Sequence, residues 1–499
     1  MYTVNYLDNY LRKFNCAQGL IEIGKLSKQL HQSRKSFDNF PIIVNGIKYQ
    51  QTISQWGLSF FAYRLILLSN DGKSRRLTFS DIAQAHGIFG ELNVPLDTIE
   101  DIISFLLRTS QEQFFSQQFH LPTTWARYLE IYQYEDFFSD AFYKLSQLTI
   151  EDYFKLGLIF SFYLSQMKEP TINIAQLTKA KYTLRTDDIL ISEKIERFLS
   201  LTAGTYEDIR YEARSRNNLI LPYYEQFEFN PLMRYPIVRG DKRFSYYELI
   251  IPNPLLLDNK IAQGIYWELR SYYEKMNDKS KRNDFLKKFG EAFENYVHQL
   301  LLRYFGEENV SRAKDLIKVK NENRQADFIV TENDNIFIFE CKSSLVPLIA
   351  RQTFLATTIS SWIRRNLVHA VTQLDTTENE LIRSGFIGSK NVYKFILLHE
   401  ELYIINTEFV KEQLLKNHLN ARPTVNDIHI ISINELEGME QVIKNYGLSK
   451  IIEINSDTQR ELAGNFISAC RAIDNQVPIR NHYLESQFQK VVSDWAGKV

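Results

Sequence analysis

Two short apolar runs joined by a polar turn constrain the fold of this chain more than any other part of its sequence. The first run is Ala326–Thr331, the second is Ile336–Lys342, and positions 332–335 between them hold Glu, Asn, Asp and Asn. Asn and Asp tolerate the left-handed backbone conformations that tight hairpins require. Apolar side chains occupy both faces of each run, which is typical of central strands that are buried on both sides. The pattern therefore predicts a β-hairpin inside a sheet that helices cover on both faces.

The register of this hairpin places two carboxylates opposite each other. If Asn333 and Asp334 are the two turn residues, Asp327 lies directly across from Glu340. Like charges in that position destabilise a strand pair, and carboxylates among apolar neighbours are costly to desolvate. A divalent cation removes the conflict, because Mg²⁺ prefers oxygen ligands and takes one or two carboxylates together with water and phosphate oxygens.

A lysine completes the group, because Lys342 follows Glu340 by two residues and points to the same face. Its ammonium group can orient or help to deprotonate an attacking water, or neutralise charge on a phosphate. The alternative is that Glu340 and Lys342 form a surface pair on an edge strand. Edge strands rarely carry apolar residues on both faces, so the buried interpretation is favoured.

Helices and further strands are predicted on either side of the hairpin. Phe285–Phe305 has an apolar residue at every fourth position and ends at Gly306, as a helix with a C-terminal glycine does. A second helix pattern covers Phe354–Leu374. Further strands are predicted at Ile317–Val319, Val392–Leu398 and Ile428–Ile433, the last leading into a helix that begins near Asn434. This order predicts a mixed α/β domain with helices on both faces of its sheet.

An Asp, twelve residues, and then Glu-x-Lys on a hairpin resembles the PD-(D/E)XK nuclease superfamily, with its restriction-endonuclease-like α/β core. The resemblance covers residues 285–399, and Ala326 replaces the Pro of the motif's name. It implies that Asp327 and Glu340 bind Mg²⁺ or Mn²⁺, that Lys342 is catalytic, and that the backbone carbonyl of Cys341 is a further metal ligand.

The same resemblance implies two more site residues, one on each flanking helix. On the helix before the hairpin, Glu294 is expected to bind metal and take part in catalysis, with Glu291 one turn away as the alternative. The competing interpretation makes Glu294 a solvated residue or an ion-pair partner of Lys288 or His298. On the helix after the hairpin, Gln373 is the polar residue expected near the site, and the competing interpretation makes it an ordinary helix residue.

Residues 1–275 are predicted to form a mainly helical domain, and residues 276–499 the nuclease domain with a C-terminal extension. Helix-like spacing of apolar residues occurs at Ile99–Leu107, Trp125–Leu145 and Ile150–Leu164, the last with Thr149 as its N-cap. The proline-containing stretch Phe227–Asn253 predicts a short strand pair or an irregular connector. The polar, basic run Asp278–Lys288 is interpreted as the boundary between the domains, either a solvated linker or a contact for phosphates.

Composition and motif searches exclude several classes of protein. The formal net charge of −1 is unlike that of a protein that coats DNA without specificity, so contacts to nucleic acid would use local basic patches. Three widely spaced cysteines give no disulfide framework or zinc-finger spacing, which fits a reducing cytoplasm. No signal peptide or membrane span is expected, and no phosphate-binding loop, dinucleotide fingerprint or zinc-protease motif occurs.

The expectation is therefore a cytoplasmic, Mg²⁺-dependent endonuclease that hydrolyses phosphodiester bonds, with DNA as the favoured substrate and no membrane contact. A role in bacterial defence against phage is suggested only by association, because a long helical part is fused to the nuclease core. The helical domain would sense a target, bind a protein partner, mediate oligomerisation or regulate cleavage. Two alternatives stay open: an RNA-directed nuclease on the same fold, and an inactive nuclease fold kept as a binding or assembly module.

Overall fold

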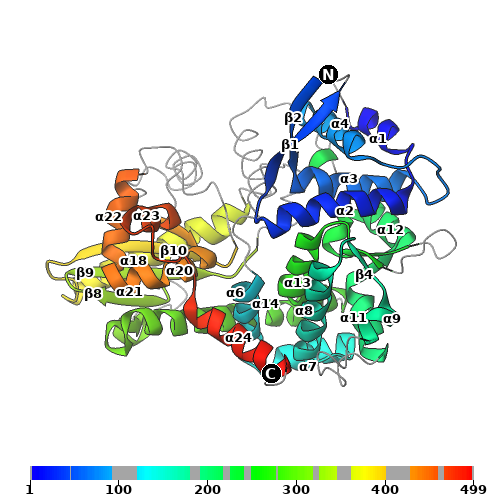
Figure 1. Ribbon diagram of the computed structural model, residues 1–499. Helices are drawn as coiled ribbons and strands as arrows, with labels where there is room; N and C mark the ends of the chain where they lie inside the picture. The colour runs from blue at the N-terminus through cyan, green and yellow to red at the C-terminus, as the bar shows by residue number, and fades with distance from the viewer. Residues whose placement is uncertain are drawn as a thin grey trace.

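A five-stranded mixed sheet forms the centre of the C-terminal half of the chain (Figure 1). The computed structural model describes residues 3–44, 47–92, 121–179, 192–216, 225–240, 249–276, 279–317, 325–345, 361–400, 428–458 and 466–496. The strands are β7 (Val310–Arg312), β8 (Phe328–Glu332), β9 (Asn335–Lys342), β10 (Asn391–Leu398) and β11 (Ile428–Ser432), and their order in the sheet is β11-β10-β9-β8-β7. β9, β10 and β11 run parallel, whereas β7 and β8 pair antiparallel with their neighbours.

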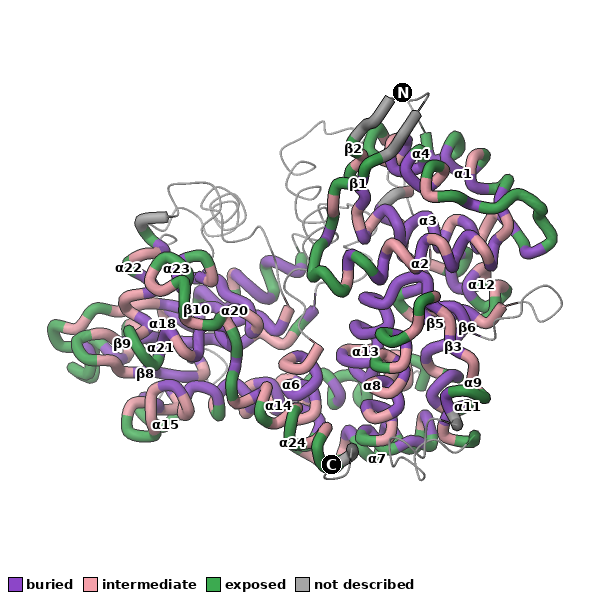
Figure 2. The backbone as a smooth tube through the Cα atoms, viewed as in Figure 1, coloured by how far each residue is buried: buried purple, intermediate pink, exposed green. Residues whose placement is uncertain are grey.

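The predicted hairpin register is confirmed. Glu332 pairs with Asn335 and Phe328 pairs with Phe339, so Asn333 and Asp334 are the two turn residues. Asn333 has a φ of 53°, in the left-handed region that Asn tolerates better than most residues. Figure 2 shows the exposed tip of this hairpin and the buried residues further along both strands.

The two faces of the hairpin enter two different apolar clusters, as central strands require. Phe328 and Phe339 pack on the side of helix α14 (Lys279–Phe305), whereas Ile329 and Ile338 pack on the side of helix α18 (His369–Arg383). All four side chains are at most 1% exposed. The prediction of strands that are buried on both faces, in a sheet covered by helices on both sides, is therefore confirmed.

Because the hairpin turn sets the register, a substitution at Asn333 tests how firmly it is specified. We expect Asn333→Val to lower the free energy of unfolding by about 1–2 kcal/mol, since a β-branched residue resists positive φ. Asn333→Gly should leave the stability within about 0.5 kcal/mol of that of the wild type. Denaturant unfolding of the two variants measures the difference, and equal stabilities would show that the turn does not depend on this conformation.

Two predicted elements near the sheet were placed wrongly. Helix α14 begins at Lys279, so the described part of the polar run, Lys279–Lys288, forms the first turns of a helix and is not a linker. The strand next to the hairpin is β7 at Val310–Arg312, and Ile317, the one described residue of the predicted strand Ile317–Val319, belongs to no strand. Three-residue strands give too little alternation to be located from sequence.

The other predicted elements around the sheet agree with the structure within the described residues. Gly306 ends α14 with a φ of 84°. The second helix is described from residue 361; it contains a π-helical turn, η6 (Arg364–Val368), and continues as α18 to Arg383. Ser432 caps α20 as predicted for a helix start near Asn434. The other elements described in this half are η4 (Glu307–Asn309), α15 (Ala313–Leu316), α20 (Ile433–Gly438), α21 (Glu440–Tyr446), α22 (Leu448–Thr458), α23 (Phe466–Ile473) and α24 (His482–Ala496).

The described part of the N-terminal half is mainly helical, as predicted, and contains two small sheets. Its helices are α1 (Val4–Leu11), α2 (Cys16–Gln32), α3 (Gln55–Leu68), α4 (Phe79–Gly90), α6 (Leu121–Tyr132), α7 (Asp136–Ser146), α8 (Ile150–Gln166), α9 (Ile174–Lys179), α11 (Ser192–Thr202), α12 (Tyr206–Arg216), η2 (Glu225–Phe227), η3 (Pro231–Met233) and α13 (Pro254–Lys275). One sheet is the hairpin of β1 (Phe37–Val44) and β2 (Ile47–Ser54); the other has the order β3-β6-β5-β4, with β3 (Thr171–Ile172), β4 (Ala203–Thr205), β5 (Ile237–Arg239) and β6 (Leu249–Ile250).

Local predictions in this half had mixed outcomes. The Thr149 hydroxyl accepts a hydrogen bond of 2.9 Å from the Asp152 N–H and caps α8 as predicted. The apolar stretch Trp125–Leu145 forms two helices, α6 and α7, where one continuous pattern was predicted. β5 and β6 are the short strand pair expected within Phe227–Asn253. The helix expected at Ile99–Leu107 lies outside the described residues.

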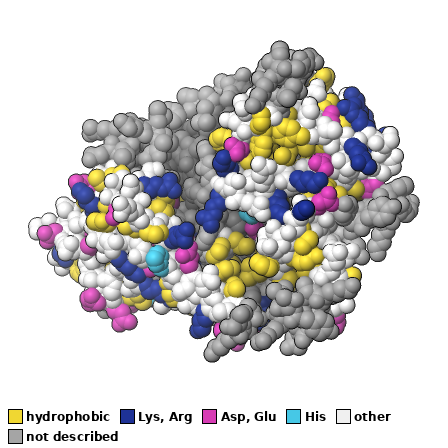
Figure 3. All heavy atoms as spheres, viewed as in Figure 1, with side chains coloured by type: hydrophobic (Ala, Val, Ile, Leu, Met, Phe, Trp, Pro, Cys, Tyr) yellow, Lys and Arg dark blue, Asp and Glu magenta, His cyan; other side chains and the backbone are white. Residues whose placement is uncertain are grey.

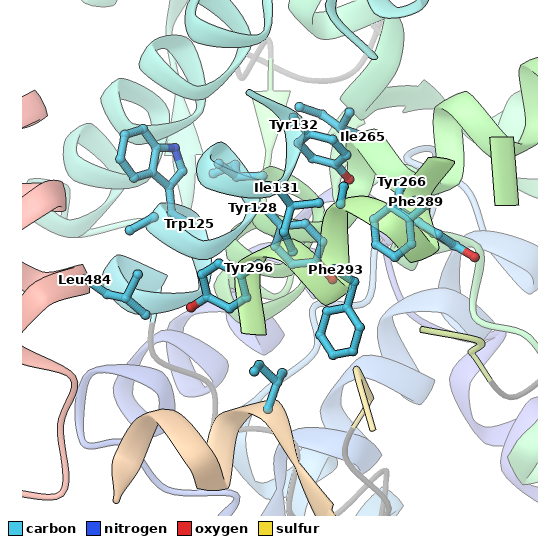
Figure 4. Close-up of a cluster of buried hydrophobic side chains, with 14 of the residues drawn as sticks. Trp125, Tyr128, Ile131, Tyr132, Ile265, Tyr266, Phe289, Phe293, Tyr296 and Leu484 are labelled. Atoms are coloured by element: carbon cyan, nitrogen blue, oxygen red, sulfur yellow. The ribbon is translucent and has the colours of Figure 1, made fainter. Parts of the chain in front are cut away.

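One apolar core joins the two halves of the chain. Helices α6, α14 and α24 lie between the N-terminal helices and the five-stranded sheet (Figure 1). Figure 4 shows the centre of this cluster, where Trp125 and Tyr132 from α6 meet Tyr266 from α13 and Phe289 and Tyr296 from α14. The same cluster continues to the sheet, so it crosses the predicted domain boundary at residue 275, which itself stays a prediction. No helix in the described part of the chain has the length and apolar character needed to cross a membrane.

Candidate active site

Backbone hydrogen bonds hold Asp327 at the start of β8. Its N–H donates to the Phe339 carbonyl over 3.0 Å, and its carbonyl accepts from the Ala313 N–H over 3.0 Å. One carboxylate oxygen, Oδ2, accepts a hydrogen bond of 2.7 Å from the Cys341 N–H. The residue is thus fixed between β7 and β9, one position beyond the Phe328–Phe339 pair, and its charge acts on Glu340.

Glu340, Lys342 and Gln373 form one hydrogen-bonded chain across the sheet and α18. The Lys342 ammonium contacts Glu340 Oε1 and donates to Gln373 Oε1 over 2.8 Å. The amide nitrogen of Gln373 donates to the Gln325 carbonyl over 3.2 Å. Gln373 therefore holds the lysine in place from the helix that the sequence predicted, and both Glu340 and Gln373 are buried.

One oxygen of the buried carboxylate has no hydrogen-bond partner. Glu340 is 2% exposed, and its Oε2 contacts no donor in the part of the chain that the structure describes. A buried charged oxygen without a partner is costly, and natural proteins keep such groups where a bound species completes them. A hard divalent cation is the species whose chemistry matches an orphaned carboxylate oxygen beside a second carboxylate.

The carboxyl groups at and beside this end of the hairpin have raised pKa values, so their ionisation is disfavoured. Burial, reinforced by the charge of Asp327, raises the pKa of Glu340 well above its usual range, and Lys342 only partly opposes this. Burial also raises the pKa of Asp327, against the hydrogen bond from Cys341 and the charge of Lys342. The pKa of Glu294 rises to about 7 through burial and then through the nearby Asp327. The charge of Asp327 thus disfavours ionisation of both Glu340 and Glu294, a repulsion that a shared cation would relieve.

This arrangement predicts that cation binding strengthens with pH. Glu294 has a pKa of about 7 in the folded chain against a usual 4.5, so its ionisation lowers stability as pH rises between these values. A cation displaces that proton, and its apparent affinity should weaken about tenfold per pH unit below 7 if one proton is released. We expect Mn²⁺ to raise the melting temperature more at pH 8 than at pH 6. Equal shifts at the two pH values would contradict the assignment of these carboxyls as ligands.

On α14, Glu294 faces the hairpin acids and Glu291 faces the lysines that precede it. The charges of Asp327 and Lys342 both act on Glu294. Glu291 instead lies 3.7 Å from the ammonium groups of both Lys287 and Lys288. Lys288 also forms a 2.8 Å ion pair with Glu135, so among the described residues its ion-pair partners are Glu135 and Glu291 and do not include Glu294. The geometry therefore favours Glu294 over Glu291 as the acidic residue of this helix near the site.

Cys341 can offer its backbone to a cation but not its thiol. The side chain is buried in the apolar cluster on the α14 side, and burial raises the pKa of the thiol well above its usual range. Its backbone N–H points toward Asp327, and within a strand the carbonyl of the same residue leaves on the same side. The predicted role for the Cys341 carbonyl is compatible with this direction.

The described residues contain no group of three or more His, Cys, Asp and Glu side chains placed to hold a metal ion. A cation at the hairpin would thus depend on the Asp327 and Glu340 carboxylates together with water and substrate oxygens. That is the usual manner of Mg²⁺, which keeps several waters and binds few protein groups. The residues present fit this kind of site and do not fit a closed structural metal centre.

Two side chains beside the site could not be singled out from the sequence. Arg312 lies on β7, whose position was not predicted, and its guanidinium lies 5.6 Å from the centre of the Phe328 ring. The His298 ring stacks on Phe328 with 5.3 Å between ring centres and 9° between ring planes. The one available signal was the spacing of His298, one helical turn after Glu294 on the same face of α14.

A scan against protein-family models finds no match to the chain, and a search among curated proteins finds none either. The choice of a function for this chain therefore depends on the chemistry of the side chains around the hairpin.

Proposed function

We propose that this chain is a metal-dependent nuclease of the PD-(D/E)XK type, with a restriction-endonuclease-like core at residues 285–399. The observation that carries the proposal is the arrangement at the end of the hairpin. The charge of Asp327 acts on Glu340, one buried oxygen of Glu340 has no hydrogen-bond partner among the described residues, and Lys342 is held between Glu340 and Gln373. A helix on each face and a parallel strand beside β9 are in keeping with such a core.

Each residue then has a definite task in phosphodiester hydrolysis. Asp327 and Glu340 would hold Mg²⁺ or Mn²⁺, with Glu294 and the Cys341 carbonyl bound directly or through water. When bound, the cation supplies Lewis-acid polarisation of the phosphate and a water of lowered pKa. Lys342 orients that water or neutralises charge that develops on the phosphate. Gln373 keeps the lysine beside the acids, because its amide oxygen accepts from Lys342 while its amide nitrogen is anchored on Gln325.

DNA is the favoured substrate, and this preference rests on the resemblance to the superfamily alone. The surface drawn in Figure 3 mixes Lys and Arg with Asp, Glu and apolar side chains, so contacts to nucleic acid are proposed to be local. Residues 1–275 would sense a target, bind a partner or regulate cleavage, in keeping with a cytoplasmic enzyme of anti-phage defence. Two alternatives remain as outcomes of experiment: cleavage of RNA, and a fold that binds nucleic acid without cutting it.

A substrate panel tests the proposal. Full-length protein is incubated with linear and supercoiled DNA duplex, single-stranded DNA and RNA, with Mg²⁺, with Mn²⁺ and with a chelator. Metal-dependent cleavage of DNA is the expected result, and cleavage of RNA alone would replace the substrate while keeping the chemistry. Absence of cleavage under every condition, together with absence of Mn²⁺-dependent stabilisation, would refute the enzyme.

A further inference from the structure

Arg312 is a cation next to the site that forms no ion pair with any described carboxylate. Within the described ranges, no Asp or Glu oxygen lies within ion-pair distance of its guanidinium, although its charge opposes the rise in pKa of both Asp327 and Glu294. Other buried or half-buried arginines of the chain do have such partners, as Arg127 has Glu437 at 2.6 Å and Arg234 has Glu212 at 2.6 Å. A half-buried guanidinium beside two carboxyls, yet not bonded to them, is available for an external anion.

The position of Arg312 relative to the acids is fixed by the sheet. Arg312 pairs with Phe328 across β7 and β8, and the next residue, Ala313, donates its N–H to the Asp327 carbonyl over 3.0 Å. Its side chain is directed to the face of the sheet that carries Phe328 and α14. It therefore lies one residue from the position opposite Asp327, on a rigid strand and not on a loop.

His298 and Phe328 shape the same spot from α14 and β8. The Phe328 ring is 0% exposed and supports both the imidazole of His298 and the guanidinium of Arg312. Burial and the charge of Arg312 lower the pKa of His298, against the opposite effect of Asp315, so the ring is neutral at pH 7 and can donate one hydrogen bond. Among the described residues, the polar groups around this spot are the Arg312 cation, the neutral His298 ring and the carboxyls of Glu294 and Asp315.

We propose that Arg312, with His298 beside it, forms a phosphate-binding subsite adjoining the Asp327–Glu340 pair. In this subsite the guanidinium binds the oxygens of a substrate phosphodiester next to, or at, the bond that is cut. Arg is suited to this task because its planar fork of N–H groups matches phosphate oxygens and its charge is permanent. The inference rests on the proposed nuclease function, since the ligand is the substrate of that site.

The test separates phosphate binding from metal binding and from catalysis. In a background carrying Lys342→Ala, binding of a short DNA duplex and of the RNA duplex of the same sequence is measured in Mg²⁺ over a range of salt concentrations. Arg312→Gln should weaken binding roughly 10- to 100-fold, as loss of a charge-assisted hydrogen bond does. It should also reduce the slope of log K against log salt by about 0.9, the contribution of one phosphate contact. The arm that loses affinity identifies the polymer from which the phosphate comes.

Two further variants make the result specific. Arg312→Lys should keep the salt slope but recover only part of the affinity, because Lys supplies the charge without the fork. Arg197→Gln is the matched charge control, since Arg197 lies on α11 in an exposed ion pair with Glu193, and it should bind as the parent does. Mn²⁺-induced thermal stabilisation should be the same in Arg312→Gln as in the parent, which also establishes that the variant is folded.

Different results overturn different statements. An unchanged affinity and salt slope in Arg312→Gln would overturn the subsite while leaving the nuclease intact. Loss of Mn²⁺ stabilisation in Arg312→Gln, with the thermal transition itself retained, would show that Arg312 serves the metal site and would also overturn the subsite. A parent protein that neither binds nucleic acid nor responds to Mn²⁺ would overturn both proposals together.

Discussion

Replacing Lys342 by alanine is expected to reduce metal-dependent cleavage by about 10²- to 10⁴-fold, the usual contribution of a positioned proton-transfer group. The lysine contacts Glu340 and Gln373, and its positive charge acts on both Asp327 and Glu340. Single-turnover cleavage of the preferred substrate, at saturating Mg²⁺, measures the effect on the chemical step. Mn²⁺-induced stabilisation should persist, because the alanine removes no metal ligand.

A surface lysine provides the control for this variant. Lys450 lies on α22 in an exposed pair with Glu453, and Lys450→Ala should cleave at the rate of the wild type. A rate for Lys342→Ala within a few fold of this control would remove the lysine from the chemistry. It would favour a merely electrostatic role for Lys342 in keeping Glu340 ionised.

Replacing Glu340 by glutamine is expected to abolish cleavage and yet to stabilise the protein in the absence of metal. Burial and Asp327 raise the pKa of Glu340 well above its usual range, so above the usual pKa of a glutamate this residue lowers the free energy of unfolding. Glutamine has nearly the same shape and no charge. The melting temperature of the metal-free protein should rise by roughly 1–3 °C, and Mn²⁺ should no longer raise it further.

This opposite movement of stability and activity distinguishes a ligand from a structural residue. Glu453→Gln, at a 62% exposed position of α22, is the matched control and should change neither quantity. If Glu340→Gln instead lowers the melting temperature of the metal-free protein, the ion pair with Lys342 outweighs the repulsion from Asp327. Glu340 would then have a structural role, and the metal assignment would lose its main support.

The hairpin and its acids were predictable because the information lies within eighteen consecutive positions. Alternating apolar residues, a turn containing Asn333 and a period of two determine which residues face each other, so Asp327 could be paired with Glu340 from the sequence. To place Gln373 near the site, the sequence had to show only which face of one helix is turned toward the hairpin. These properties are local in the sequence, and the structure has the predicted hairpin register and places Gln373 beside Lys342.

What the sequence could not supply is the set of contacts between distant segments. Arg312 reaches the site only because β7 pairs with β8, and a three-residue strand leaves no periodic signal. The choice between Glu294 and Glu291 depended on which face of α14 is turned toward the sheet. It also depended on Lys287 and Lys288, which lie beside Glu291. The polar start of α14 was taken for a linker, since the Phe-rich stripe that marks the helix begins only at Phe285.

The apolar core around α14 has a further consequence. One side of this helix carries Glu294 and His298 beside the hairpin, while Phe289 and Tyr296 are embedded among residues of α6 and α13. Because α14 carries both sets of contacts, a displacement of α6 or α13 that α14 follows would also move Glu294 relative to Asp327. Binding of a partner to the N-terminal helices would alter the spacing of the acidic groups if it displaced α14 in this way. Cutting the chain at residue 275 would remove the contacts of α6 and α13 with α14 and leave an aromatic face of α14 exposed to water.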